Sequence, residues 1–252
     1  MKIVRFWDGN QIAFGKLEND KVKIIEGDVF GGYKIGNKEY EVQQIQILAP
    51  CDPTKVVCIG LNYFDHANEL SMPVPKTPVV FLKPPSSITG PNTNVFYPPG
   101  CTRLDYEAEL AVVIGQITRY IEPHQASDRI LGFTCSNDIT ARNLQPKDGQ
   151  WTLAKSFDTF CPIGPFIETE LEPNNLEIKL FLNGEQKQSS NTSEMIFNIE
   201  HLISYISKHM TLFPGDVVIT GTPAGVGPMN VGDVVEVEIE RLGKLTNTVV
   251  SM

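Results

Sequence analysis

The segment Arg103–Gly115 constrains the fold of this chain more than any other. Its second half, Leu110–Ile114, is aliphatic and ends at a glycine, as a strand that runs into the interior would. Side chains alternate between the two faces of a strand, so Asp105, Glu107 and Glu109 are predicted to share one face. Carboxylates that crowd together on a buried face must either protonate or bind a cation.

The acidic face has two explanations, and the residues alone leave both open. A lone Glu-x-Glu pattern usually marks the solvated face of an edge strand, but the apolar run that follows favours burial. Oxygen-only ligands suit a hard cation such as Mg²⁺, Mn²⁺ or Ca²⁺, provided that another segment adds a ligand. Asp138 is a candidate because it follows a predicted strand, Leu131–Ser136. Its alternative role is the N-cap of a helix over Thr140–Leu144.

Composition excludes several classes of function. The net charge is −9 and the Lys and Arg residues form no basic run, so nucleic acid and anionic membranes are not expected partners. The chain starts without an apolar signal segment and has no run near the roughly 20 apolar residues that span a bilayer. Its five cysteines are scattered and form no Cys-x-x-Cys pair, which disfavours a zinc site and a disulfide framework. We therefore expect a cytoplasmic protein.

The pattern of short apolar runs predicts a mixed, mainly β fold in two parts, a small β-rich domain over residues 1–50 and a larger domain over residues 51–252. The expected strands are Lys2–Phe6, Gln11–Leu17, Lys21–Ile25, Glu41–Ile47, Lys55–Ile59, Val79–Lys83, Leu131–Ser136, Cys161–Ile167, Leu176–Leu182, Val217–Thr220, Val234–Glu240 and Leu245–Val250. Helices are expected over Pro123–Ile130 and Asn198–Lys208, a hairpin turn at Asn183-Gly184, and a long loop over Pro84–Gly100.

A short helical stretch, Asn62–Leu70, carries His66 and Glu69 three residues apart, hence on one helix face. A lone histidine is more often structural, but a carboxylate neighbour would fix its tautomer and raise its basicity as a general base. Lys155 is either a surface lysine or a partner for a substrate carboxylate. The glycine-rich stretch 221–227 lacks the helix that a dinucleotide loop requires, although its amides could line a pocket for a substrate anion.

Seen together and in order, these motifs resemble the fumarylacetoacetate hydrolase family, in particular bacterial acylpyruvate hydrolases and 2-hydroxyhepta-2,4-diene-1,7-dioate isomerases. The resemblance covers the C-terminal four-fifths of the chain, and the N-terminal unit is similar to the small extra domain of bacterial members. The motifs are Ile59-Gly60-Leu61-Asn62-Tyr63, Phe81-Leu82-Lys83-Pro84, Leu104-Asp105-Tyr106-Glu107-Ala108-Glu109-Leu110, Ser136-Asn137-Asp138-Ile139-Thr140-Ala141-Arg142, Lys155-Ser156-Phe157-Asp158 and Gly221-Thr222-Pro223. Leu61 departs from the family, where an arginine is common.

The resemblance implies a β-roll core, a homodimer, and Mg²⁺ or Mn²⁺ as the cofactor, with Ca²⁺ as a substitute in crystals. The implied metal ligands are Glu107, Glu109 and Asp138. In members that cleave carbon–carbon bonds, the equivalents of His66 and Glu69 activate water from a mobile lid, and Lys155 lies near the metal. The implied substrate contacts are Tyr63, Lys83, Arg142, Gln145 and Thr222.

The resemblance also implies a small 2-oxo acid as substrate and a metal-bound enolate in the reaction. We expect either hydrolysis of a carbon–carbon bond in an acylpyruvate or decarboxylation of an oxaloacetate-like acid. The alternative is an isomerase or tautomerase of 2-hydroxyhepta-2,4-diene-1,7-dioate or oxaloacetate, and a more distant one is a binding protein without catalysis. A glycosidase is disfavoured because Glu107 and Glu109, roughly 7 Å apart at Cα, would lie side by side on one strand.

Overall fold

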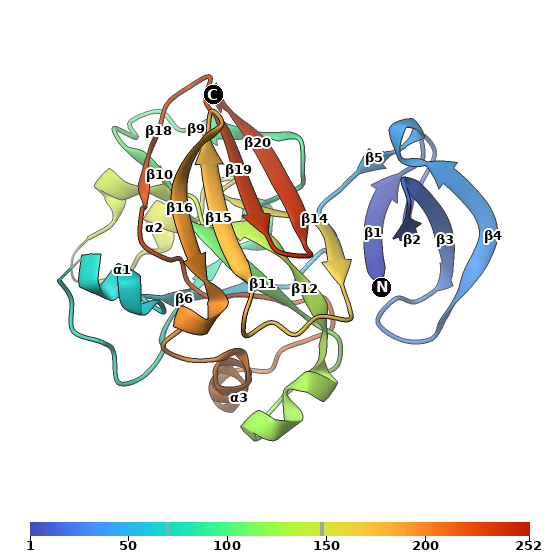
Figure 1. Cartoon of the computed structure of the whole chain (residues 1–252), viewed down its shortest axis with the longest axis horizontal. Coiled ribbons are helices and arrows are strands. Elements are labelled where there is room, and N and C mark those ends of the chain that lie inside the picture. The colour runs from blue at the N-terminus through green and yellow to red at the C-terminus, as the bar shows by residue number, and fades with distance from the viewer. Residues whose placement is uncertain (70, 147–148) are drawn as a thin grey trace.

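The computed structural model describes residues 1–69, 71–146 and 149–252 and has the expected mixed, mainly β architecture, with a small N-terminal unit beside a larger body (Figure 1). A 12-stranded sheet runs through both parts. In spatial order its strands are β4 (Tyr33–Glu41), β3 (Lys21–Gly27), β2 (Ile12–Glu18), β1 (Lys2–Trp7), β14 (Cys161–Glu168), β12 (Ile130–Asn137), β11 (Ala108–Ile114), β17 (Val217–Ile219), β6 (Val56–Gly60) and β7 (Val79–Lys83), with β5 (Gln46–Ile47) on β1 and β8 (Ile88–Thr89) on β14.

Two smaller sheets and three α-helices complete the body (Figure 1). The five-stranded sheet has the order β16 (Glu185–Asn191), β15 (Glu177–Leu182), β19 (Val234–Ile239), β20 (Gly243–Ser251) and β9 (Thr93–Tyr97). The three-stranded sheet consists of β13 (Thr140–Ala141), β10 (Leu104–Tyr106) and β18 (Gly227–Met229). The helices are α1 (Phe64–Glu69), α2 (Thr152–Lys155) and α3 (Ile199–His209). Among the described helices, none is long and apolar enough to cross a membrane.

Strand β11 lies in the interior with both faces covered, as its aliphatic sequence predicts. Leu110 and Val112 belong to the core that also contains apolar residues of β15, β19 and α3. Ala111 and Val113 face a second core, built with residues of β6, β14 and β17. Because β11 lies between two apolar layers, the acidic residues at its start are buried as well.

Local signals explain the elements that were predicted well. Asn183 and Gly184 have φ angles of 54° and 80°, the left-handed conformations that a two-residue hairpin turn between β15 and β16 needs. Helix α3 begins after Asn198, whose side chain accepts a hydrogen bond from the backbone N–H of His201 at 3.0 Å. The buried side of α3 is the apolar stripe that the helical spacing predicts.

The N-terminal strands form an antiparallel meander that joins the main sheet through β1 and β14, with Lys2 opposite Glu168. A small apolar core that includes Val4, Phe6 and Phe166 fills this junction. Because hydrogen bonding is continuous across it, the two parts share one sheet, and the domain boundary at residue 50 stays a prediction.

Four predicted elements are wrong. The region predicted as the strand Glu41–Ile47 begins at the end of β4 and continues through a 3₁₀ turn to the two-residue β5. Strand β4 itself is polar and largely exposed, so it shows no apolar alternation. The supposed loop Pro84–Gly100 contains β8 and β9, whose parallel partners lie far along the chain. Segment Pro123–Ile130 forms two 3₁₀ turns before β12, and Thr140–Leu144 is a short strand followed by a 3₁₀ turn.

Candidate metal centre

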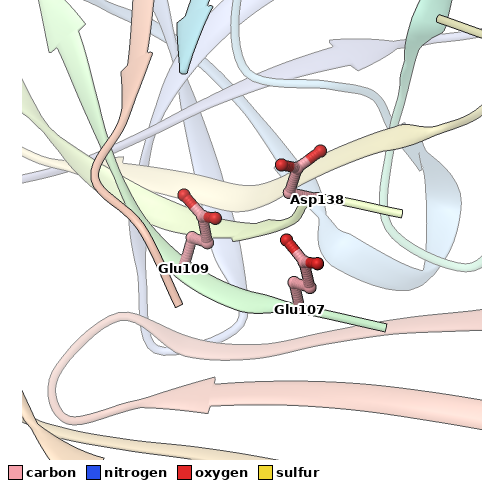
Figure 2. Close-up of side chains that lie close together, drawn as sticks. All are labelled: Glu107, Glu109 and Asp138. Atoms are coloured by element: carbon pink, nitrogen blue, oxygen red, sulfur yellow. The ribbon is translucent and has the colours of Figure 1, made fainter. Parts of the chain in front are cut away.

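Three carboxylates converge at the start of β11 and the end of β12 (Figure 2). Glu107, Glu109 and Asp138 each offer one oxygen, and these oxygens all lie within 4.8 Å of one another. All three residues are buried. The sequence pattern therefore brings together, in space, the three side chains that the family resemblance implies as metal ligands.

The backbone places these side chains through a break in the acidic strand. Glu107 lies between β10 and β11, and its N–H donates to Oδ1 of Asn137 at 2.9 Å. The N–H of Asp138 in turn donates to the carbonyl oxygen of Glu107 at 2.9 Å. Since Ala108 pairs with Asn137 in the β11–β12 ladder, the residue after β12 must lie beside the residue before β11. Adjacent strand ends thus join two ligands that are 31 positions apart in sequence.

Two sequence-based interpretations need correction here. Asp105 does not join the cluster, because the break at Glu107 ends the alternation and Asp105 pairs with Arg103 and Arg142, at 2.8 Å each. Asp138 is not a helix cap either, since the following residues form β13 and a 3₁₀ turn whose N-cap is Ala141.

Cationic side chains compensate two of the three carboxylates. Lys155 donates to Oε2 of Glu107 at 2.8 Å and to Oδ2 of Asp138 at 2.6 Å, so it is not the surface lysine of the alternative interpretation. Lys83 donates to the other oxygen of Asp138, and Arg142 donates to Oε1 of Glu107 at 2.5 Å. Burial opposes ionisation of Glu107, but the charges of Lys155 and Arg142 outweigh it and lower its pKa to about 2.

Glu109 is the carboxylate without such compensation. Within residues 1–69, 71–146 and 149–252 it forms no ion pair, and Oε2 accepts one hydrogen bond, from the N–H of Gly221 at 2.7 Å. Burial, together with the negative charges of Asp138 and Glu107, raises the pKa of Glu109 well above its ordinary value. A cluster of buried oxygen donors with excess negative charge fits a hard divalent cation such as Mg²⁺ or Mn²⁺.

The cluster opens into a cavity of about 690 Å³. Its lining residues are Ile59, Gly60, Leu61, His66, Met72, Phe81, Glu107, Glu109, Asp138, Arg142, Gln145, Pro146, Trp151, Lys155 and Thr222. The predicted substrate contacts Arg142, Gln145 and Thr222 are therefore in position to touch a bound molecule. A cavity of this size lies in the range of small-molecule sites, roughly 300–1,000 Å³.

His66 and Glu69 form the expected pair on α1. Nδ1 of His66 lies 2.9 Å from Oε2 of Glu69, and His66 lines the cavity. The other oxygen of Glu69 accepts the N–H of Gly225 at 3.1 Å, so the carboxylate is itself held in place. A hydrogen bond from Nδ1–H to this carboxylate would leave Nε2 as the acceptor, as a general base requires.

Two predicted substrate contacts lie outside the cavity lining. Tyr63 is packed in the core beneath α1, where burial raises its pKa well above the ordinary value. Lys83 is buried, and donates to Asp138 and to the carbonyl oxygen of Ile139. Lys83 therefore positions and neutralises Asp138, and its contact with substrate stays a prediction.

The glycine-rich stretch after β17 binds protein carboxylates with its amides, in contrast to the predicted pocket for a substrate anion. Besides the bond from Gly221 to Glu109, the N–H of Ala224 donates to Oδ1 of Asp65 at 3.3 Å. Oδ2 of Asp65 accepts from the hydroxyl of Ser190 at 2.7 Å. One loop thus touches the acidic cluster and also holds α1, the main part of the predicted lid; Leu70, its last residue, lies outside the described residues.

Sequence reasoning missed Asp65, whose carboxylate docks α1, and this role gives a prediction. In Asp65→Ala the hydrogen bonds from Ala224 and Ser190 are lost, and amides of α1 should exchange on the order of 10- to 100-fold faster, because each such bond stabilises by roughly 0.5–3 kcal/mol. Hydrogen exchange read by mass spectrometry measures this. Asp128→Ala, at an exposed 3₁₀ turn, is the matched control. Unchanged exchange in α1 would show that other contacts hold the helix.

Two family models match this chain, and together they cover nearly all of it. Residues 55–250 match the family described as fumarylacetoacetate (FAA) hydrolase C-terminal, and residues 1–50 match the family described as Rv2993c-like, N-terminal. The chain is 46% identical over 220 residues to the mitochondrial oxaloacetate tautomerase FAHD2A of Bos taurus, covering 82% of this chain and 70% of that protein.

Solved structures agree with the whole fold. The 2-hydroxyhepta-2,4-diene-1,7-dioate isomerase of Mycobacterium marinum superposes with a TM-score of 0.93 at 41% identity, covering 100% of this chain and 98% of the other. Maleylpyruvate hydrolase from Sphingobium sp. SYK-6, in complex with manganese(II) and pyruvate, gives a TM-score of 0.83 at 28% identity and covers 100% and 99%. These relatives thus include a tautomerase, an isomerase and a hydrolase.

Proposed function

The chain belongs to the fumarylacetoacetate hydrolase family, and on this premise we propose that it is a divalent-metal-dependent enzyme that hydrolyses a carbon–carbon bond in an acylpyruvate-type 2-oxo acid. The observation that carries the proposal is that one cavity is lined both by the three-carboxylate cluster and by His66, whose Nδ1 lies 2.9 Å from Glu69. The manganese and pyruvate bound by the hydrolase relative support the same chemistry.

In this proposal Glu107, Glu109 and Asp138 hold Mg²⁺ or Mn²⁺. The bound ion would supply Lewis-acid polarisation of the substrate's 2-oxo group. Lys155 and Lys83 orient the carboxylates of Glu107 and Asp138 and balance their charge, because their ammonium groups donate to them. The interior position of the cluster excludes bulk water and strengthens every electrostatic contact made there.

His66 would act as the general base towards water. Glu69 holds Nδ1, so Nε2 takes a proton from a water molecule as its oxygen bonds to the acyl carbonyl carbon. The bond between that carbon and C3 of the pyruvate unit then breaks. Its electron pair passes to the pyruvate unit as an enolate, and the proton from His66 restores the methyl group. The products are a carboxylic acid and pyruvate, which together account for substrate and water.

A second candidate is tautomerisation of oxaloacetate, which the FAHD2A relative favours. This reaction needs only a proton transfer between carbon and oxygen, and His66 could carry it without activating water. Both candidates use the same cluster and the same cavity. They differ in their products, because tautomerisation releases no pyruvate.

A substrate panel with and without metal tests the proposal. With Mn²⁺ or Mg²⁺ present, we expect an acylpyruvate to lose its enol absorbance and to yield equal amounts of pyruvate and carboxylic acid. Removal of metal by EDTA should lower the rate by about 100-fold or more, since Lewis-acid stabilisation is worth several kcal/mol. Product analysis by NMR and coupled pyruvate detection provide the measurement.

The panel also includes oxaloacetate and 2-hydroxyhepta-2,4-diene-1,7-dioate. Enol–keto exchange of oxaloacetate without pyruvate would favour the tautomerase, whereas pyruvate and CO₂ would indicate decarboxylation. A metal-loaded protein that is silent on every compound would overturn the proposal and favour a binding protein.

A further inference from the structure

The cavity carries an aromatic wall that leads away from the acidic cluster. The ring centroid of Phe81 lies 5.3 Å from Nζ of Lys155, the ammonium that bonds to the cluster. Trp151 packs edge-on against Phe81, with the ring centroids 5.3 Å apart. Met72 and Leu61 add aliphatic surface to the same lining. Apolar surface therefore begins next to Lys155 and continues over Phe81 and Trp151.

The indole of Trp151 can occupy its position only because residue 60 is a glycine and has no side chain. A Cβ atom on Gly60 would lie 2.7 Å from Cζ3 of Trp151, closer than atoms of this kind approach. The indole therefore lies directly against the backbone at the end of β6, and it also contacts Phe81 on the neighbouring strand β7. Trp151 is also the residue whose carbonyl accepts the N–H of Lys155 in α2, at 3.1 Å. The backbone of Trp151 is therefore hydrogen-bonded to Lys155, the residue that binds the cluster carboxylates.

Leu61 reaches the lining from a strained backbone. Its φ angle is 47°, in the left-handed region that is costly for a leucine. The neighbouring Asn62 holds this conformation, because its side chain donates to the carbonyl oxygen of Thr220 at 2.7 Å and accepts the N–H of Phe197 at 2.8 Å. Strain that the surroundings maintain at a cavity is a common feature of ligand contacts.

The charges of the described lining suit a substrate with one carboxylate. Its cationic side chains are Lys155 and Arg142. Lys155 already donates to two cluster carboxylates, and Arg142 donates to Asp105, Glu107 and Gln145. A divalent ion at the cluster would bind the one carboxylate of the 2-oxo acid head. Within this described lining, no cation is left over for a second one.

We propose that the wall of Leu61, Phe81, Met72 and Trp151 receives the substrate's tail, so that the substrate is an acylpyruvate with an alkyl or aryl acyl group and not a dicarboxylic 2-oxo acid. This inference rests on the proposed function, since it takes the 2-oxo acid end to lie at the cluster. The cavity of about 690 Å³ has room for such a tail beyond a pyruvate-sized head.

Calorimetric titration of the Mn²⁺-loaded protein with three unreactive oxamates tests the proposal. Oxamate presents the head alone, N-butyloxamate adds an apolar tail, and N-(3-carboxypropyl)oxamate adds a charged one. Each buried methylene contributes roughly fourfold in affinity, so N-butyloxamate should bind at least about tenfold tighter than oxamate. The carboxypropyl compound should bind no tighter than oxamate.

Substitutions in the wall test whether the tail of the ligand binds there. Trp151→Ala should remove most of the gain from the butyl group while oxamate binding stays within about twofold. Leu153→Ala, 77% exposed in the helix that follows Trp151, is the matched control. Because loss of Trp151 could disturb Lys155, Met72→Lys provides a second test. A cation at this half-exposed position of the lining should make the carboxypropyl compound the tighter ligand.

The outcomes separate the two proposals. Failure of wild-type protein to bind oxamate would count against the proposed function itself. If wild-type protein binds oxamate but binds the carboxypropyl compound as tightly as N-butyloxamate, or more tightly, the proposed apolar tail is overturned. A butyl preference that Trp151→Ala and Met72→Lys both leave unchanged would overturn it as well.

Discussion

Glu109→Gln is expected to stabilise the metal-free protein and to weaken Mn²⁺ binding by more than about 100-fold. Glu109 is buried beside Glu107 and Asp138 and lies in no ion pair of the described chain, so its charge adds repulsion that protonation or a metal ion must relieve. Glutamine has the same shape and its amide oxygen can still accept the N–H of Gly221. Loss of an outer-shell partner alone costs about 10–100-fold in metal affinity, and loss of a ligand should cost more.

The same change two residues earlier provides the comparison. Glu107→Gln removes the carboxylate that Lys155 and Arg142 share, so that, among the described carboxylates, Lys155 keeps only Asp138 and Arg142 only Asp105. Breaking a buried pair typically costs about 3–5 kcal/mol. Thermal melts in EDTA should therefore move up for Glu109→Gln and down for Glu107→Gln, while calorimetry should show weak Mn²⁺ binding for both. Glu172→Gln, at an exposed position, controls for the loss of a surface charge. A lower melting temperature for Glu109→Gln in EDTA would contradict the assignment of Glu109 as the uncompensated carboxylate.

The parts of the fold that could be predicted from sequence are those with local signals. Strand β11 combines an aliphatic run with a terminal glycine, and α3 combines an apolar stripe with the Asn198 cap. Strands β4 and β9 were missed because β4 is polar and exposed, and because β9 pairs in parallel with β20, about 150 residues away. Pairing over that distance leaves no mark in the local pattern.

The site shows the same division between local and long-range information. The family motifs led to Glu107, Glu109 and Asp138, and the structure brings their carboxylates together. The partner of each carboxylate depends on tertiary contacts that no local pattern contains. Lys83 was predicted only as a substrate contact, and its burial against Asp138 follows from tertiary packing at the end of β7.

The aromatic wall could not be predicted from local sequence. The position of the Trp151 indole depends on Gly60, which lies some 90 positions earlier in the chain. The homodimer and the cytoplasmic location stay predictions.

His66→Ala should separate metal binding from chemistry. His66 lines the cavity on α1 and its bonded neighbour is Glu69, so it contacts none of the three cluster carboxylates. Mn²⁺ and oxalate affinity should therefore stay within about twofold of wild type, whereas turnover of an acylpyruvate should fall about 10²–10⁴-fold, the usual contribution of a general base. Steady-state kinetics and calorimetry on the same preparation measure both quantities. His201→Ala, on the exposed side of α3, is the matched control.

The pattern across substrates then decides what His66 does. Decarboxylation of oxaloacetate needs an electron sink more than a base, so His66→Ala should impair it less than it impairs acylpyruvate hydrolysis. Glu69→Gln keeps an acceptor for Gly225 but removes the charge that faces Nδ1, and its loss of hydrolysis should be smaller than that of His66→Ala. Equal losses in both reactions would mean that His66 holds the substrate or α1 in place. Full hydrolase activity in His66→Ala would remove the pair from the mechanism, and water would then have to be activated at the metal cluster itself.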